Sequence, residues 1–354
     1  MVRAMSNVPM SFPQLTLKNN CMWLRRFSLI SSFVFCLLSP TVHAQNTEER
    51  DILKLLQMTQ AAAKKSSYAG TFVYQQGNQI RTSKITHGFD GDTEVEKLEI
   101  LDAKPREYIR RNGEVACYLP DSKVIQIEKN LSQEEFPALL SENVSLLPES
   151  YSIKKAQMSR VAGLECQVLN LQPKDALRYG FRLCVEKNAG LLLGVQTLNP
   201  RNEVIEQIAF TQISLGEVDK HRLKPSFTNV AQWKTENMTV QANVNSGWTV
   251  KNLPSGFKKT LETKRLIPIS ANVASTDPAQ TKSHQVVQMM FSDGLSTISV
   301  FVEPNTGNRT EGSLQQGAMT IMGKRSGDNW LTVVGEVPNA AIKQVMNSIQ
   351  FNKR

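Results

Sequence analysis

Short segments of alternating apolar and polar residues, separated by turn residues, constrain the fold of this chain more than any other feature. They follow one another from residue 68 to residue 128, with turn dipeptides such as Gly77-Asn78, Asp90-Gly91 and Asn112-Gly113 between them. Alternation with a period of two, bounded by such dipeptides, is typical of antiparallel strands joined by tight turns. Further strands are expected in two pairs, 163–172 with 178–186 and 191–199 with 203–212. The pattern predicts an antiparallel meander.

An amphipathic helix is expected before these strands, because Ile52, Leu55, Leu56 and Ala63 fall on one face at helical spacing. A polar stretch with weak periodicity, 216–245, is interpreted as a linker. Beyond it come several short strand patterns and a final helix after Asn339. We therefore predict an α+β, mainly antiparallel protein with three mature parts. These are a strand-rich domain at 45–215, the linker at 216–245 and a small α+β domain at 246–354.

The first 44 residues have the pattern of a signal peptide. Arg25-Arg26 precedes an apolar run from Phe27 to Leu38, and Val42-His43-Ala44 offers small side chains at the positions that a signal peptidase reads. We expect cleavage after Ala44 and export to the periplasm. The apolar run is shorter than the roughly 20 residues that span a bilayer, and an uncleaved anchor is the alternative interpretation.

Positive charge is concentrated in the last third of the chain. Lys and Arg number 41 against 32 Asp and Glu over the whole sequence. Residues 45–229 are balanced, whereas 230–354 hold an excess of basic side chains. This excess is either a solvated face or a docking surface for an acidic partner. Nucleic acid is not expected as a partner, because the basic residues do not cluster on one helix and an exported protein does not meet the chromosome.

No pattern of catalytic or metal-ligating residues stands out. His87, His221 and His284 are not spaced as metal ligands with one another or with a cysteine, and no G-x-S-x-G sequence occurs. We expect neither an enzyme, nor a metal site, nor a cofactor.

Three cysteines lie beyond the predicted cleavage site, in a compartment that permits disulfides. Cys117 and Cys166 each alternate with apolar neighbours, whereas Cys184 alternates with Arg182 and Glu186. Matching the faces favours a Cys117–Cys166 disulfide. Folding 163–172 back on 178–186 would instead bring Cys166 opposite Cys184, so this pairing stays open, as does the alternative of three free thiols.

Five segments together carry a family resemblance: Tyr68–Tyr74, Arg178–Leu183, Leu253–Phe257, Phe291–Leu295 and Val333–Pro338. They resemble the RseB/MucB family of periplasmic negative regulators of the envelope-stress sigma-E factor. The resemblance implies a lipoprotein-carrier-like, unclosed β-barrel wrapped on a helix, followed by the small α+β domain. It also implies binding to the periplasmic part of a membrane-bound anti-sigma factor and protection of that factor from proteolysis.

A barrel of this kind suits acyl chains, because each buried CH₂ contributes about 0.8 kcal/mol and few polar contacts are needed. The expected ligands are lipid, lipopolysaccharide or lipoprotein acyl chains. Candidate cavity residues share strand faces, and plain core packing is the alternative for each: Phe72, Tyr74, Ile125, Ile127, Tyr179, Phe181, Leu183 and Val185. A lipid or lipoprotein carrier without a regulatory role is the alternative function.

The resemblance also implies that the second domain contacts the anti-sigma factor. Candidate contact residues are aromatic or basic, the types that anchor interfaces: Trp248, Phe257, Lys258, Lys259, Arg265, Phe291, Phe301 and Trp330. A second copy of the chain is a further candidate partner.

Overall fold

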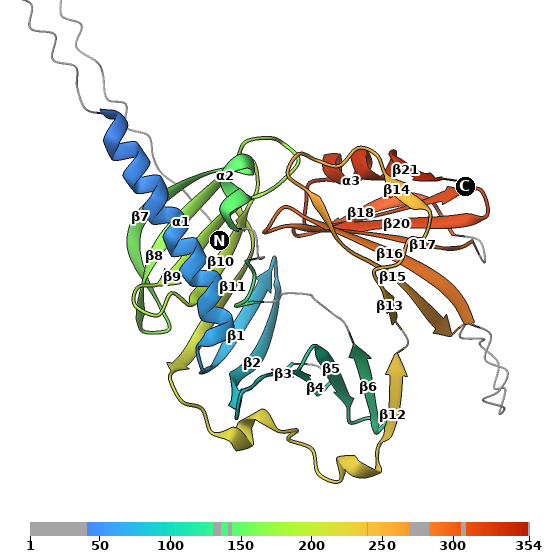
Figure 1. The fold of residues 1–354 in the computed structure, drawn as a ribbon, viewed down its shortest axis with the longest axis horizontal. Helices are drawn as coiled ribbons and strands as arrows, with labels where there is room; N and C mark the ends of the chain where they lie inside the picture. Colours follow the sequence, from blue (N-terminus) through green and yellow to red (C-terminus); the bar gives the residue numbers. More distant parts are fainter. Residues whose placement is uncertain are drawn as a thin grey trace, which may run out of the picture. The chain divides into compact units, whose positions relative to one another are not determined.

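A computed structural model describes residues 41–102, 104–129, 136–140, 144–238, 240–268, 283–305 and 309–352 of the chain (Figure 1). The predicted signal peptide lies outside the described residues as far as residue 40, so its cleavage stays a prediction. Within the described part of the chain, no helix is both long and apolar enough to cross a membrane.

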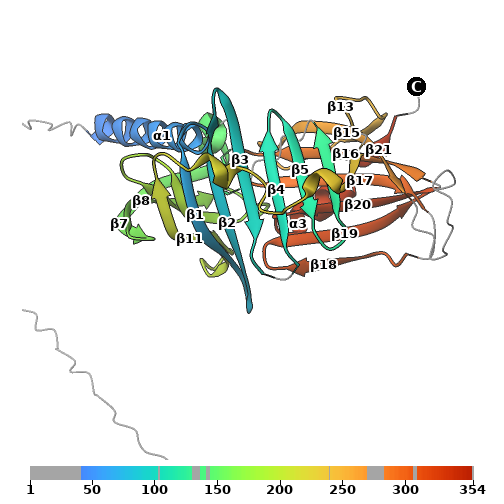
Figure 2. The same cartoon turned by 90° about the horizontal axis from the view of Figure 1, so that it is seen from below.

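The first domain is built on one twelve-stranded sheet, in the order β12-β6-β5-β4-β3-β2-β1-β11-β10-β9-β8-β7. Its pairs are antiparallel except β12 with β6, which is parallel. Figure 2 shows β1 to β5 side by side in sequence order. The strands are β1 Tyr68–Gln76, β2 Gln79–Asp90, β3 Thr93–Ile100, β4 Arg106–Arg111, β5 Glu114–Leu119, β6 Val124–Lys129, β7 Tyr151–Val161, β8 Leu164–Pro173, β9 Gly180–Glu186, β10 Leu192–Leu198, β11 Val204–Leu215 and β12 Lys234–Met238. The edge strands β12 and β7 do not pair with each other, which confirms the prediction of an unclosed sheet.

Helix α1 (Thr41–Lys65) supplies the apolar face on which this sheet packs. Ile52, Leu56 and Ala63 are buried in a core that also contains Phe72 and Leu183. The helical spacing of these residues predicted this face correctly, although the helix begins earlier than the apolar pattern suggested. Two short helices, η1 (Val144–Leu146) and α2 (Leu147–Ser150), precede β7.

The second domain is a seven-stranded antiparallel sheet, in the order β13-β15-β16-β17-β20-β19-β18, with one face covered by helix α3 (Figure 1). Helix α3 (Asn339–Met346) buries Ile342 and Val345 in a core with Val300 and Val333 of the sheet. The strands are β13 Val240–Ala242, β14 Trp248–Val250, β15 Lys258–Pro268, β16 Ser283–Ser292, β17 Thr297–Pro304, β18 Gly312–Gln316, β19 Met319–Ser326, β20 Asn329–Gly335 and β21 Ile349–Phe351, of which β14 and β21 form a separate pair. This arrangement confirms the predicted small α+β domain.

The segment expected to be a linker, 216–245, has structure of its own. It holds two short helices, η2 (Lys220–Leu223) and η3 (Val230–Gln232), before it adds β12 to one sheet and β13 to the other. We call residues 216–233 the strap, because Val218 and Leu223 pack it against β2 to β4. At Gly88 a Cβ atom would lie 2.5 Å from Cγ2 of Val218, so glycine permits this close approach.

The buried amino group of Lys97 fastens the strap to the sheet. Its side chain is only 2% exposed, and Nζ donates hydrogen bonds to the Lys224 carbonyl at 2.9 Å and to the Ser226 hydroxyl at 2.6 Å. Glu107 lies 3.3 Å from the same amino group and accepts a hydrogen bond from the Ser226 N–H at 2.9 Å. These contacts satisfy a charge that would otherwise be buried at a large cost.

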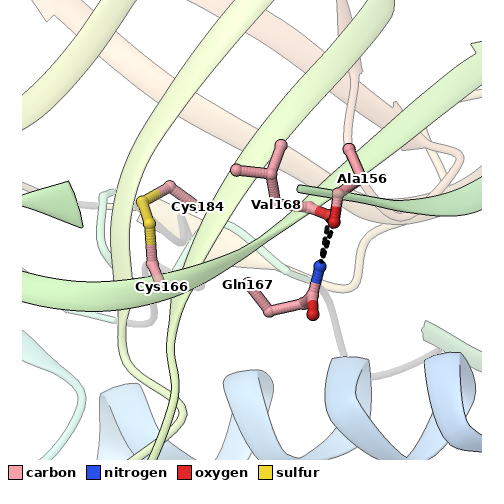
Figure 3. Close-up of a disulfide and its surroundings, with 5 residues drawn as sticks. All are labelled: Ala156, Cys166, Gln167, Val168 and Cys184. Carbon is pink, nitrogen blue, oxygen red and sulfur yellow. Dashed lines mark hydrogen bonds between the residues drawn. A yellow bond between two sulfur atoms is a disulfide. The ribbon is translucent and has the colours of Figure 1, made fainter. Parts of the chain in front are cut away.

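The disulfide joins Cys166 to Cys184, with a Cα–Cα distance of 5.4 Å (Figure 3). The Cys117–Cys166 pairing favoured by strand faces is therefore wrong, and Cys117 is a free thiol. The reason lies in strand order, because β8 and β9 are neighbours whereas β5 lies far across the sheet from β8. Beside the disulfide, the Gln167 amide donates to the Ala156 carbonyl at 2.7 Å, where the register of β7 against β8 shifts.

Candidate functional site: a cavity between the two domains

A cavity of about 850 Å³, lined by side chains of both domains, is a candidate ligand site. Volumes of roughly 300–1,000 Å³ are usual for small-molecule sites. Side chains from the first domain on its wall are Tyr74, Phe136, Leu139, Leu146, Phe181, Val195, Thr197, Glu206, Gln207 and Ile208. Those from the second domain include Lys258, Lys259, Met290, Asp293, Leu295, Met319, Val334 and Glu336.

A cluster of aromatic rings makes the first-domain wall apolar and rigid. The Phe136 ring centroid lies 5.2 Å from that of Phe72 and 5.1 Å from that of Phe210, in edge or tilted arrangements. Such contacts are favourable beyond the area they bury. Phe136 borders the cavity, and Phe72 and Phe210 support it from behind.

Glu206 brings a carboxylate to this largely apolar wall and links it to the second domain. Its oxygens accept hydrogen bonds from the Tyr74 hydroxyl at 2.9 Å, the Gln76 amide at 3.3 Å and the Thr197 hydroxyl at 3.4 Å. A fourth donor is the N–H of Ala318, at 3.4 Å, in the second domain. Burial raises the pKa of Tyr74 strongly, and the neighbouring Glu206 carboxylate raises it further. Tyr74 is therefore a hydrogen-bond donor to Glu206 and not an anion.

Glu336 places a second carboxylate in the cavity, from the end of β20. The side chain is exposed to the cavity, and its pKa is raised to about 7. The main cause is the loss of hydration, and the second is the carboxylate of Glu206, because like charges disfavour ionisation.

The predicted lipid-cavity residues divide into three groups. Tyr74 and Phe181 line the cavity, and their contact with a lipid stays a prediction. Phe72, Leu183 and Val185 are packed in the core behind it, and Tyr179 is buried with its hydroxyl accepting a hydrogen bond from Gln315 at 2.9 Å. Ile125 and Ile127 lie in β6. Ile125 is paired with Tyr118 of β5, and the Tyr118 ring contacts the ring of Trp233 in the strap. Alternation shows which residues share a face, but not which face borders a void.

The predicted partner-binding aromatic residues are mostly inside the second domain. Phe257, Phe291 and Trp330 are buried, while Trp248 packs against Phe351 with ring centroids 5.1 Å apart. Phe301 is half-buried on β17.

The predicted basic residues are more accessible. Lys258 and Lys259 are exposed at the cavity, and Lys259 also pairs with Glu262 at 2.8 Å. Arg265 pairs with Glu128 of the first domain at 3.0 Å, so it bridges the two domains.

Sequence reasoning did not select Glu206, Glu336, Arg178 or Asp293. The first two occupy ordinary polar positions in or beside strands, and nothing in the sequence marks them. Arg178 and Asp293 each lie in a segment singled out by family resemblance, and this was the available signal. Among the described residues, no group of His, Cys, Asp and Glu side chains could hold a metal ion.

The fold and the cavity together define a two-domain binding protein, in which an unclosed antiparallel sheet and a small α+β domain share one site with apolar and charged side chains. The chain belongs to the MucB/RseB family. The MucB/RseB N-terminal domain matches residues 51–227, and the MucB/RseB C-terminal domain matches residues 242–350.

Two relatives are similar to this chain over most of its length. The sigma factor AlgU regulatory protein MucB of Pseudomonas aeruginosa is 28% identical over 323 residues, which cover 89% of this chain and 95% of the relative. The sigma-E factor regulatory protein RseB of Escherichia coli is 23% identical over 305 residues, with 84% and 90% covered.

Solved structures agree with these relatives. MucB in complex with MucA(peri) is similar with a TM-score of 0.63 and 27% identity, covering 85% of this chain and 99% of that one. The MucA/MucB complex of Pseudomonas aeruginosa gives a TM-score of 0.64 at 27% identity, covering 86% and 100%.

Proposed function

We propose that this protein is a periplasmic regulator that binds the periplasmic part of a membrane-bound anti-sigma factor, protects it from proteolysis and so restrains the envelope-stress response. One observation carries the proposal. A MucB chain bound to MucA(peri) is similar over 85% of this chain and 99% of its own length. Membership of the MucB/RseB family across both domains supports the same conclusion.

The finer part of the proposal is that the cavity senses a lipid. Its apolar side chains offer burial to an acyl chain, and the exposed amino group of Lys258, with that of Lys259 beside its partner Glu262, offers positive charge to an anionic head group. An amphipathic ligand with one chain and a phosphate fits this combination of apolar wall and basic rim.

The protein can act as a regulator if binding of the lipid and binding of the anti-sigma factor oppose each other. A lipid that lowers the affinity for the anti-sigma factor must itself bind more weakly, by the same factor, when that factor is present. This reciprocity distinguishes a switch from two unconnected binding sites.

Calorimetric titration of residues 45–354 with the periplasmic segment of the anti-sigma factor tests the proposal. We expect binding, and weaker binding when a single-chain phospholipid is present. The variant K258Q/K259Q should lose lipid affinity, whereas the matched variant K251Q/K343Q, which alters two exposed lysines of the same domain away from the cavity wall, should not. Absence of partner binding with tight lipid binding would instead indicate a carrier, and unchanged partner affinity at saturating lipid would refute the switch.

A further inference from the structure

A fully buried ion pair joins the two domains beside the cavity. The Arg178 and Asp293 side chains are both 0% exposed, and Nη1 of Arg178 lies 2.7 Å from Oδ2 of Asp293. Arg178 lies two residues before β9 of the first domain, and Asp293 immediately follows β16 of the second. The two residues come from the two segments, Arg178–Leu183 and Phe291–Leu295, whose role the proposed function leaves unexplained.

Hydrogen bonds and aromatic rings hold the guanidinium of Arg178 in place. Nε and Nη2 donate to the Asp175 carboxylate, with the Nη2 bond at 2.9 Å, and Nη2 also donates to the Ser255 carbonyl at 2.5 Å. Its carbon lies 5.6 Å from the ring centroid of Tyr151 and 5.5 Å from that of Phe257, one ring from each domain. Because the guanidinium is planar and its donors have fixed directions, this arrangement sets an orientation as well as a distance.

Asp293 is equally well satisfied. Its Oδ2 accepts a second hydrogen bond from the Tyr151 hydroxyl at 3.1 Å, and its Oδ1 accepts from the N–H groups of Leu295 at 3.1 Å and Ser296 at 2.8 Å. The carboxylate therefore ties the 293–296 turn of the second domain to the first domain. Residues 293–295 of this turn also form part of the cavity wall.

Next to the ion pair, an apolar side chain of each domain packs with the core of the other domain. Leu295 of the second domain is buried in the core of the first, and Leu177 of the first packs against the core of the second. Gly256 allows the second-domain backbone to approach the Ser150 side chain of the first domain, since a Cβ there would lie 2.5 Å from Oγ of Ser150.

We propose that the Arg178–Asp293 pair is a lock that holds the two domains in one orientation and so sets the shape of the cavity between them. Loss of Arg178 leaves the buried Asp293 carboxylate without a cation, and the contact then opens to let water reach it. Loss of the Asp293 charge removes the acceptor of Nη1 from the second domain, while Asp175 still pairs with Arg178 inside the first domain. The lock itself does not depend on the proposed function, whereas its consequence for partner binding rests on it.

Distance measurement between the domains tests the lock. In the C117S background, spin labels on cysteines at two exposed positions, Arg160 of β7 and Lys324 of β19, report the interdomain distance by pulsed electron paramagnetic resonance. We expect a single narrow distribution for the otherwise unaltered protein, and a broadened or two-population distribution for R178M and for D293N. The matched control is R182M, because Arg182 lies in β9 and bonds to Asn170 and Gln196 within the first domain.

The D293N variant keeps the lock testable if R178M does not fold. Asparagine keeps the shape of the side chain and the oxygen that accepts from Leu295 and Ser296, and removes the charge that Arg178 meets. Distributions as narrow and unshifted in R178M and D293N as in the unaltered protein would overturn the lock.

Titration of the same samples with the anti-sigma segment separates the lock from the proposed function. Weaker binding by R178M and D293N than by R182M supports a locked two-domain platform for the partner. No binding by the unaltered protein would remove the proposed function, while the distance distributions still judge the lock.

Discussion

Two carboxylates from different domains face one cavity, and they are not equivalent. Glu206 receives hydrogen bonds from four residues, including the N–H of Ala318. Glu336 lies where protein replaces much of its hydration, and its pKa rises to about 7. The raised pKa means that Glu336 binds a proton at pH values where an ordinary glutamate is ionised.

We expect the protonation of Glu336 to make the free energy of unfolding depend on pH. The ordinary pKa of Glu336 is 4.5 and its pKa in the folded protein is about 7, so between these values the folded state binds a proton that the unfolded state does not. Stability should therefore be highest below the lower value, fall as pH rises through this window and level off above it. We expect E336Q to be more stable than the unaltered protein at high pH by about 1–2 kcal/mol, after allowance for solvent screening in the open cavity.

Urea denaturation at about pH 5 and about pH 8 measures this difference. The control is E49Q, which removes an exposed carboxylate of α1. An equal pH dependence in E336Q and the unaltered protein would contradict the assignment.

The disulfide gives a second prediction at the scale of residues. It closes a loop with a sequence separation of 18 between Cys166 and Cys184, and such a cross-link stabilises mainly by restricting the unfolded chain. We expect C166A/C184A to lower the free energy of unfolding by about 2–4 kcal/mol, and C117A, which removes the free thiol, to cost less. Equal losses in the two variants would show that packing of the sulfur atoms, and not the cross-link, matters.

At the scale of elements, the strap is held mainly by polar contacts. Lys97 donates to two groups of the strap, and Glu107 both pairs with Lys97 and accepts from Ser226. A small apolar cluster of Val95, Ile109 and Leu223 lies alongside. Removing the amino group would leave buried acceptors without donors, which is costly.

We therefore expect K97M to release the strap from the sheet. Amide hydrogen exchange in residues 216–233 should become faster, because local opening no longer breaks the Lys97 contacts. The control is K84M, which removes the half-exposed partner of Glu99 in β2 and touches no strap residue in the described contacts. Protection of the strap that is the same in K97M and K84M would show that the apolar cluster suffices.

The strap is an example of structure that could not be predicted from the sequence. Strands such as β1 to β6 could be predicted, because alternation and turn dipeptides are local and the sheet they form has one buried face. The strap has a polar sequence and looked like a linker, since its anchor is a lysine in a distant strand. Cys184 looked solvent-facing for a similar reason, because alternation with Arg182 and Glu186 does not reveal that β9 is buried on both faces along nearly all of its length. The cavity depends on contacts between domains, and no local pattern encodes these.

At the scale of the whole molecule, the two domains are joined at several separate points. Besides the Arg178–Asp293 lock, Arg265 pairs with Glu128, and the Gln76 amide donates to the Gln316 carbonyl at 3.1 Å. Strand β12 extends the first sheet, and the same stretch of chain continues into β13 of the second. Each core receives a leucine from the other domain.

These connections predict that the two domains unfold together. In differential scanning calorimetry we expect a single transition for the unaltered protein, with the calorimetric enthalpy close to the van't Hoff enthalpy. The R178M variant should show two separate transitions, because it removes the central interdomain contact while each domain keeps its own core, and R182M should keep one. Two transitions in the unaltered protein would mean that the lock is too weak to couple the cores, and the cavity would then lie between domains that open independently.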